Sequence, residues 1–143
     1  MPGASTLIFE HPSRGIRRRD LKAFFTDVTA RLCEGEVTCL VTTDAELRRL
    51  NRTFCKKDYP TDVLSFPSGP AAGELAISLD RAQAQAQELG HTLEEELRIL
   101  ILHGTLHLTG MDHESDQGEM AAAETRWRKR LKLPAGLIER TQA

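Results

Sequence analysis

The sequence has few cysteines, little net charge and no long apolar run. Its three cysteines, Cys33, Cys39 and Cys55, form no CxxC pair and follow no charged-then-apolar leader, which favours a reducing, cytoplasmic setting. The apolar run at residues 99–102 is far too short to cross a bilayer, so we expect no membrane role. The formal net charge of −2 excludes a histone-like polycation, so any binding of nucleic acid requires a local basic patch.

Length and organisation indicate one domain. A chain of 143 residues is long enough to bury a hydrophobic core without covalent staples. It contains no internal repeat, low-complexity tract or linker, so residues 1–143 are predicted to form a single domain. Only residues 134–143, from Pro134 onward, are predicted to form a loose C-terminal tail.

Strand-like and helix-like segments alternate along the chain, which is typical of an α/β fold. The helix expected over residues 93–108 begins at a capping box, Thr92 with Glu95, and carries apolar side chains on nearly every side. We therefore expect it to be the buried central helix. The expected strands cover residues 6–9, 36–41, 63–66 and 74–77, and the other expected helices cover 19–32, 43–53, 80–89 and 116–131.

Three histidines near the end of this central helix form the most informative motif. His103 and His107 are four residues apart and share one helix face. Gly110 breaks the helix and allows the chain to bring His113 to the same point. The spacing predicts a metal site with three imidazole ligands. The other two histidines are remote in sequence and have no predicted role.

The type and number of these ligands favour zinc. Three imidazoles leave the fourth tetrahedral position for water, as in catalytic zinc sites, where the pKa of water falls from about 16 to about 7. Metzincin proteases share the spacing but place a glutamate, their general base, directly after the first histidine. Here that residue is Gly104, which disfavours peptide hydrolysis. The sequence therefore predicts one zinc ion per chain at a hydrolytic centre for another substrate.

Basic residues gather in three clusters, at 14–22, 48–57 and 126–132. Each cluster by itself is typical of a solvated helix face. The middle cluster is the best candidate for a contact with nucleic acid, and it consists of Arg48, Arg49, Arg52, Lys56 and Lys57.

Two further segments, together with the histidine motif, carry a resemblance to a known family. Residues 51–67 include the sequence Pro-Thr-Asp-Val-Leu-Ser-Phe at 60–66, and residues 73–78 read Gly-Glu-Leu-Ala-Ile-Ser. With the three histidines, Gly104 and Asp112, this pattern resembles the YbeY family of bacterial endoribonucleases. The resemblance implies an α/β fold with a small mixed four-stranded sheet packed with about five helices. It also implies a metal held by His103, His107 and His113.

The resemblance further implies a substrate and partners. The substrate is single-stranded RNA, in particular ribosomal RNA during small-subunit 3′ end maturation and ribosome quality control. Implied partners are small-subunit proteins and an assembly GTPase, and no binding to DNA is expected. Two alternatives remain open, namely a ribosome assembly factor whose zinc is structural, and a metallohydrolase acting on another substrate.

Site residues beyond the histidines are expected in two places. The family usually has an arginine where this chain has Cys55, so Arg52 and Lys56 are predicted to contact RNA and Lys57 to act in catalysis. Asp112, beside His113, is predicted to orient a ligand imidazole or to carry a proton. Glu114 could take the same roles.

Overall fold

The computed structural model of the chain describes residues 5–10, 16–55 and 61–142. Helices and strands alternate through most of this length, as the hydrophobic periodicity predicts. The elements are β1 (Ser5–Phe9), α1 (Arg18–Leu32), β2 (Val37–Thr42), α2 (Asp44–Cys55), β3 (Val63–Pro67), β4 (Gly73–Ser78), α3 (Leu79–Leu89), α4 (Leu93–Leu108), α5 (Glu119–Arg130) and α6 (Leu137–Gln142).

The strands form one mixed sheet in the order β1-β2-β4-β3. β1, β2 and β4 are parallel, and β3 pairs antiparallel with β4, Ser65 lying opposite Leu75. β3 is therefore an edge strand. The expected α/β fold with a small mixed four-stranded sheet is confirmed.

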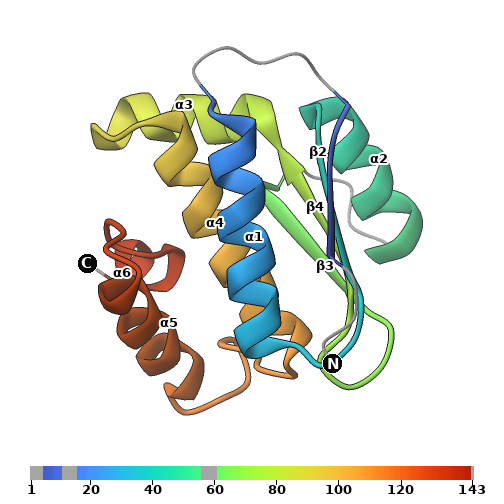
Figure 1. The fold of residues 1–143 in the computed structure, drawn as a ribbon, viewed down its shortest axis with the longest axis vertical. Coiled ribbons are helices and arrows are strands. Elements are labelled where there is room, and N and C mark those ends of the chain that lie inside the picture. Colours follow the sequence, from blue (N-terminus) through green and yellow to red (C-terminus); the bar gives the residue numbers. More distant parts are fainter. Residues whose placement is uncertain (1–4, 11–15, 56–60, 143) are drawn as a thin grey trace.

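Helices cover both faces of the sheet. In Figure 1 the sheet is seen nearly edge-on, with α2 on one side and α1 and α4 on the other. α4 packs on β3 and β4, and α1, α3, α5 and α6 in turn pack on α4. α4 is thus the central helix, as predicted. None of the described helices is long and apolar enough to span a membrane.

The sequence of α4 explains its place in the core. Its capping box is formed, with Thr92 and Glu95 each accepting a hydrogen bond from the backbone N–H of the other. Leu97, Leu100 and Leu106 are almost completely buried, and each such side chain stabilises the fold by about 2 kcal/mol. Gly104 faces the sheet, because a Cβ there would lie 2.8 Å from Leu75 Cδ2.

The C-terminal segment differs from the sequence prediction. Residues 134–143 are predicted to form a loose tail, but Leu137–Gln142 form the helix α6, so the described residues contain six helices where about five are expected. Ile138 is buried in the core, and Arg140 pairs with Glu96 of α4. The prediction was wrong because a single buried apolar residue in a polar segment leaves no visible periodicity.

The start of α5 also differs. The helix begins at Glu119, three residues later than expected. The Asp116 carboxylate accepts hydrogen bonds from the backbone N–H groups of Gly118 and Met120, so Asp116 closes the preceding turn instead of joining the helix.

Candidate metal centre

The three predicted histidines come together at the C-terminal end of α4. His103 and His107 lie one turn apart, and the chain turns back at Gly110, whose φ of 99° is in the left-handed region that favours glycine. The His103 ring centroid lies 4.8 Å from that of His107 and 5.3 Å from that of His113. One ring nitrogen of each histidine lies within 4.8 Å of the others, close enough for all three to bind one ion.

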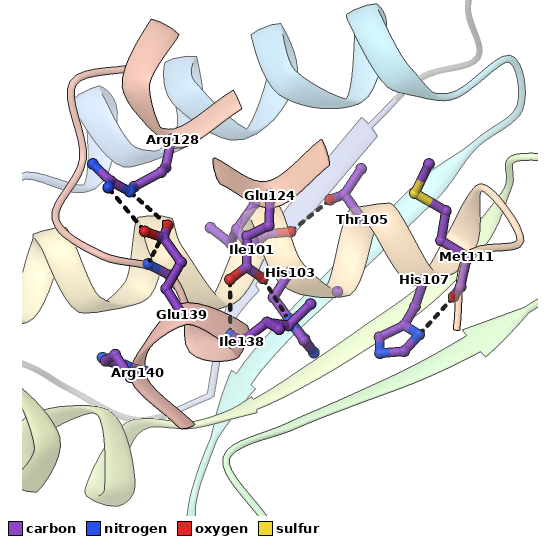
Figure 2. A network of polar contacts seen from close by, with 12 residues as sticks. Ile101, His103, Thr105, His107, Met111, Glu124, Arg128, Ile138, Glu139 and Arg140 are labelled. Carbon is purple, nitrogen blue, oxygen red and sulfur yellow. Dashed lines mark hydrogen bonds and ion pairs between the residues drawn. The ribbon is translucent and has the colours of Figure 1, made fainter. Parts of the chain in front are cut away.

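Hydrogen bonds orient two of these rings through Nδ1. His103 Nδ1 lies 2.8 Å from Glu124 Oε2, and His107 Nδ1 lies 2.9 Å from the Met111 carbonyl oxygen. Figure 2 shows both contacts as dashed lines. A carbonyl oxygen only accepts, so His107 carries its proton on Nδ1, and an ionised Glu124 imposes the same tautomer on His103. In each ring Nε2 then keeps the lone pair that a metal requires.

The electrostatics of the site favour a neutral imidazole at His107. Burial lowers the pKa of His107, and the neighbouring His103 adds to this effect, while the hydrogen bond to Met111 opposes it. A neutral ring is the form that binds a metal ion. Three imidazoles with converging nitrogens match the ligand preference of zinc and of other borderline divalent metals, so the residues present fit the expected ion.

His103 and His107 line a cleft between α4 and the edge strand β3. The Ser65 hydroxyl donates to the Gly104 carbonyl at 3.2 Å and ties the two elements together. The cleft has a volume of about 420 Å³, large enough for a phosphate group with an adjoining sugar. It is lined by Val63, Leu64, Ser65, Pro67, His103, His107, Gly110, Met111 and Asp112.

Asp112 lies in this cleft but does not hold the rings of His103 and His107. Its carboxylate accepts hydrogen bonds from the Glu114 N–H and the Ser115 hydroxyl, and these bonds lower its pKa. Glu124 and the Met111 carbonyl are the partners of His103 and His107, so for His113 beside it the orienting role of Asp112 or Glu114 stays a prediction. Asp112 remains as an exposed, ionised group at the mouth of the cleft.

Glu124 is the site residue that the sequence analysis missed. It lies on α5 and is 1% exposed, although carboxylates are rarely buried without a partner. A signal was present, because Glu124 occupies the same helix face as the apolar Met120, Ala123 and Trp127. A charge inside an apolar stripe indicates a buried polar contact.

The predicted RNA-binding residues are less well placed by the structure. Arg52 is exposed in the last turn of α2, a helix that lies on the other face of the sheet from α4 (Figure 1). Arg52 is not among the residues lining the cleft. Lys56 and Lys57, and the side chain of Cys55, lie outside the described part of the chain.

Comparison with known proteins decides the family. A family model described as Endoribonuclease YbeY matches residues 12–132. The chain belongs to the YbeY family. This confirms the resemblance carried by the histidine motif and by residues 51–67.

Individual relatives agree with this assignment to the YbeY family. The Endoribonuclease YbeY of Solibacter usitatus is 55% identical, with 99% of this chain and 98% of the relative aligned. That of Koribacter versatilis is 53% identical over 94% of this chain and 91% of its own length. The solution structure of a Thermotoga maritima protein has a TM-score of 0.62 and 25% identity, covering 89% of this chain and 91% of that one.

Proposed function

We propose that the protein is a zinc-dependent endoribonuclease that cleaves single-stranded ribosomal RNA. The observation that carries the proposal is the convergence of His103, His107 and His113, two of which, His103 and His107, line the cleft beside β3. Membership in a family described as endoribonucleases supports the substrate class. We expect it to act in the cytoplasm during small-subunit rRNA 3′ end maturation, with small-subunit proteins and an assembly GTPase as partners.

In this proposal the histidines hold one zinc ion per chain. A zinc ion in such a site supplies Lewis acidity for a phosphodiester oxygen and for an attacking hydroxyl. The Nδ1 hydrogen bonds of His103 and His107 fix both rings before RNA enters. The two imidazoles therefore need little reorganisation when the ion and the RNA bind.

The remaining steps are assigned to Asp112, which lines the cleft, and to the basic residues that the sequence predicts. Asp112 is an ionised carboxylate at the mouth of the cleft and receives the proton of the attacking hydroxyl. Arg52 and Lys56 hold the RNA backbone, and Lys57 offsets the negative charge of the transition state. A lysine grips this charge less well than the family's arginine, so Cys55→Arg should raise the rate of cleavage.

Cleavage of a labelled single-stranded RNA by the purified protein and by His107→Ala tests this function, with zinc measured in both. We expect the zinc-loaded parent to cleave and the variant to have lost both zinc and activity. Equal cleavage by both would identify a contaminating nuclease and contradict the proposal. A parent that holds zinc but leaves RNA intact would favour a ribosome assembly factor with a structural zinc.

The ends of the products distinguish the two possible nucleophiles. A 2′,3′-cyclic phosphate means that the neighbouring ribose 2′-hydroxyl attacked. A 5′-phosphate on the downstream product means that water attacked. In either reaction the proposed role of Asp112 predicts that Asp112→Asn slows cleavage while zinc content stays at the parental level.

A further inference from the structure

The buried Glu124 links the metal centre to the C-terminal helix. Its Oε2 accepts from Nδ1 of His103 at 2.8 Å, and its Oε1 accepts from the backbone N–H of Ile138 at 2.9 Å (Figure 2). Ile138 belongs to α6, the segment that the sequence had suggested to be a loose tail. One carboxylate thus receives two hydrogen bonds, one from a predicted metal ligand and one from α6.

The start of α6 is packed tightly against this carboxylate. Gly136 directly precedes the helix, and a Cβ at this position would overlap Oε1 of Glu124 and lie 2.6 Å from its Cδ. A side chain here would therefore displace the Glu124 carboxylate. The absence of a side chain at Gly136 allows the backbone to approach closely enough for Ile138 to donate its hydrogen bond.

Two ion pairs fix the rest of α6. Arg128 of α5 holds Glu139 with two hydrogen bonds, of 2.6 and 2.9 Å. Arg140 holds the fully buried Glu96 of α4 with two more, of 2.8 and 3.1 Å. Paired bonds between a guanidinium and a carboxylate set direction as well as distance. The docking of α6, and so the position of the Ile138 N–H, is well defined.

We propose that Glu124 is a positioning residue of the metal centre, and that α6 holds it so that His103 presents Nε2 to the ion. This rests on the proposed role of His103 as a metal ligand. A carboxylate accepts at both oxygens, so it satisfies both donors and keeps the His103 proton on Nδ1. If α6 were displaced, Oε1 of Glu124 would lose its hydrogen bond to Ile138. The carboxylate could then turn, and the His103 ring would lose its fixed orientation.

An amide in place of the carboxylate separates this role from simple packing. Glu124→Gln keeps the size of the side chain but offers only one acceptor oxygen. If that oxygen stays with Ile138, the amide NH₂ donates to Nδ1 of His103 and moves the ring proton to Nε2, where it blocks the metal. If the oxygen turns to His103, the NH₂ faces the Ile138 N–H and α6 loses its contact.

The matched control is Glu119→Gln, which removes one negative charge from the same helix. Glu119 is exposed, and its carboxylate accepts from the backbone N–H of Gln117. We expect zinc affinity, measured in the full-length protein by competition with a chromophoric chelator, to fall about 10–100-fold in Glu124→Gln. It should be unchanged in Glu119→Gln. Gly136→Ala, which acts from the α6 side, should weaken zinc binding in the same direction.

A second readout reports the tautomer directly. Long-range ¹⁵N–¹H NMR of the metal-free parent should find the His103 proton on Nδ1, and in Glu124→Gln on Nε2 or exchanging between the two nitrogens. A purely structural role for Glu124 would not move this signal. Because the parent alone can be measured, the test stands even if a variant folds poorly: a parental His103 proton on Nε2 would overturn the proposal.

The outcomes separate this proposal from the proposed function. If the parent binds no zinc, or if His107→Ala binds it equally well, the metal centre itself is wrong and the positioning role fails with it. If the parent binds zinc through the histidines but Glu124→Gln binds it equally tightly with the proton still on Nδ1, only the positioning role is overturned.

Discussion

Two imidazole–carboxylate pairs lie at opposite ends of α4, and they differ in what else holds the carboxylate. At the N-terminal end, His91 Nε2 lies 2.6 Å from Glu96 Oε1, and the Glu96 carboxylate also accepts hydrogen bonds from Nη1 and Nη2 of Arg140. At the C-terminal end, His103 is bonded to Glu124, whose second partner is a neutral backbone N–H of Ile138. Both carboxylates are buried, and both contact α6.

The difference separates a structural pair from a functional one. Arg140 offsets the charge of Glu96. The ion pair therefore needs no further cation, and it fixes α6 on α4. Within the described part of the chain, the partners of Glu124 are His103 and the Ile138 N–H and include no Arg or Lys, so its charge is available to the imidazole and to an ion bound by it. A divalent metal ion bound by the converging ring nitrogens would offset the negative charge of this buried carboxylate.

The largest expected contrast comes from removing each imidazole in turn. His103→Ala should lose zinc and slow RNA cleavage by about a thousandfold or more, since several kcal/mol of transition-state stabilisation depend on a complete ligand set. His91→Ala should keep both zinc and cleavage, and lose only about 1 kcal/mol of stability for one hydrogen bond. Zinc content and single-turnover rates at a temperature where both variants are folded measure the contrast. Equal loss of activity in the two would remove the distinction between the pairs.

Glu96→Ala should have the next largest effect, on stability. The change leaves the Arg140 guanidinium without its partner in a site where its side chain is only 14% exposed. We expect the free energy of unfolding to fall by about 3 kcal/mol, seen as a lower urea midpoint. Glu88→Ala on the exposed face of α3 is the control and should leave the midpoint nearly unchanged. A midpoint for Glu96→Ala equal to that of the control would show that this pair does not hold α6.

The convergence of the three histidines could be predicted from the sequence, while the groups that hydrogen-bond to their rings could not. His103 and His107 are related by one helical turn, and Gly110 marks the reversal that returns His113, so local geometry alone brings the rings together. Glu124 lies 21 residues from His103 on another helix, and only tertiary packing brings the two into contact. Periodicity does not contain such information.

The same division applies to the fold: local sequence patterns predict most helices and strands, while tertiary packing decides the rest. Most helices and strands followed from apolar spacing and capping residues, as the start of α4 after Thr92 shows. β3 pairs with β4 across a short connection, which is a local contact, but the edge position of β3, which forms one wall of the cleft, also depends on the parallel pairing of β4 with the distant β2, as in Gly73 opposite Val37. No local pattern predicts that pairing. α6 was missed because its stability comes from the contacts of Ile138 and Arg140, and a six-residue helix has little stability of its own.

Gly104→Ala tests the close approach of α4 to the sheet at the metal end of the helix. The added Cβ would lie 2.8 Å from Leu75 Cδ2 and 3.3 Å from Val63 Cγ2, so we expect a loss of about 2 kcal/mol from overpacking. If Leu75 is the obstacle, Gly104→Ala combined with Leu75→Ala should cost less than the sum of the two single changes. Strict additivity in urea denaturation would contradict this account of the glycine.

The smallest expected effect concerns the pair between Arg128 and Glu139, whose side chains are partly exposed. The Arg128 hydrogen bonds lower the pKa of Glu139, outweighing the opposing effect of burial, so the folded protein binds the proton at this carboxyl less readily than the unfolded chain does. The pair should therefore contribute its full stability above the unfolded pKa of about 4.3 and lose it as the pH falls through the lower folded value. We expect Glu139→Gln to be less stable than the parent by up to about 1 kcal/mol at pH 7, with the difference shrinking toward zero as the pH falls below 4. Urea titrations of both proteins across this range measure the difference in stability. A difference that widened on acidification would have the wrong sign for this pair.

The zinc affinity of Glu139→Gln at pH 7 should be nearly that of the parent, because Glu139 faces Arg128 and not the imidazole. This contrasts with the loss expected for Glu124→Gln.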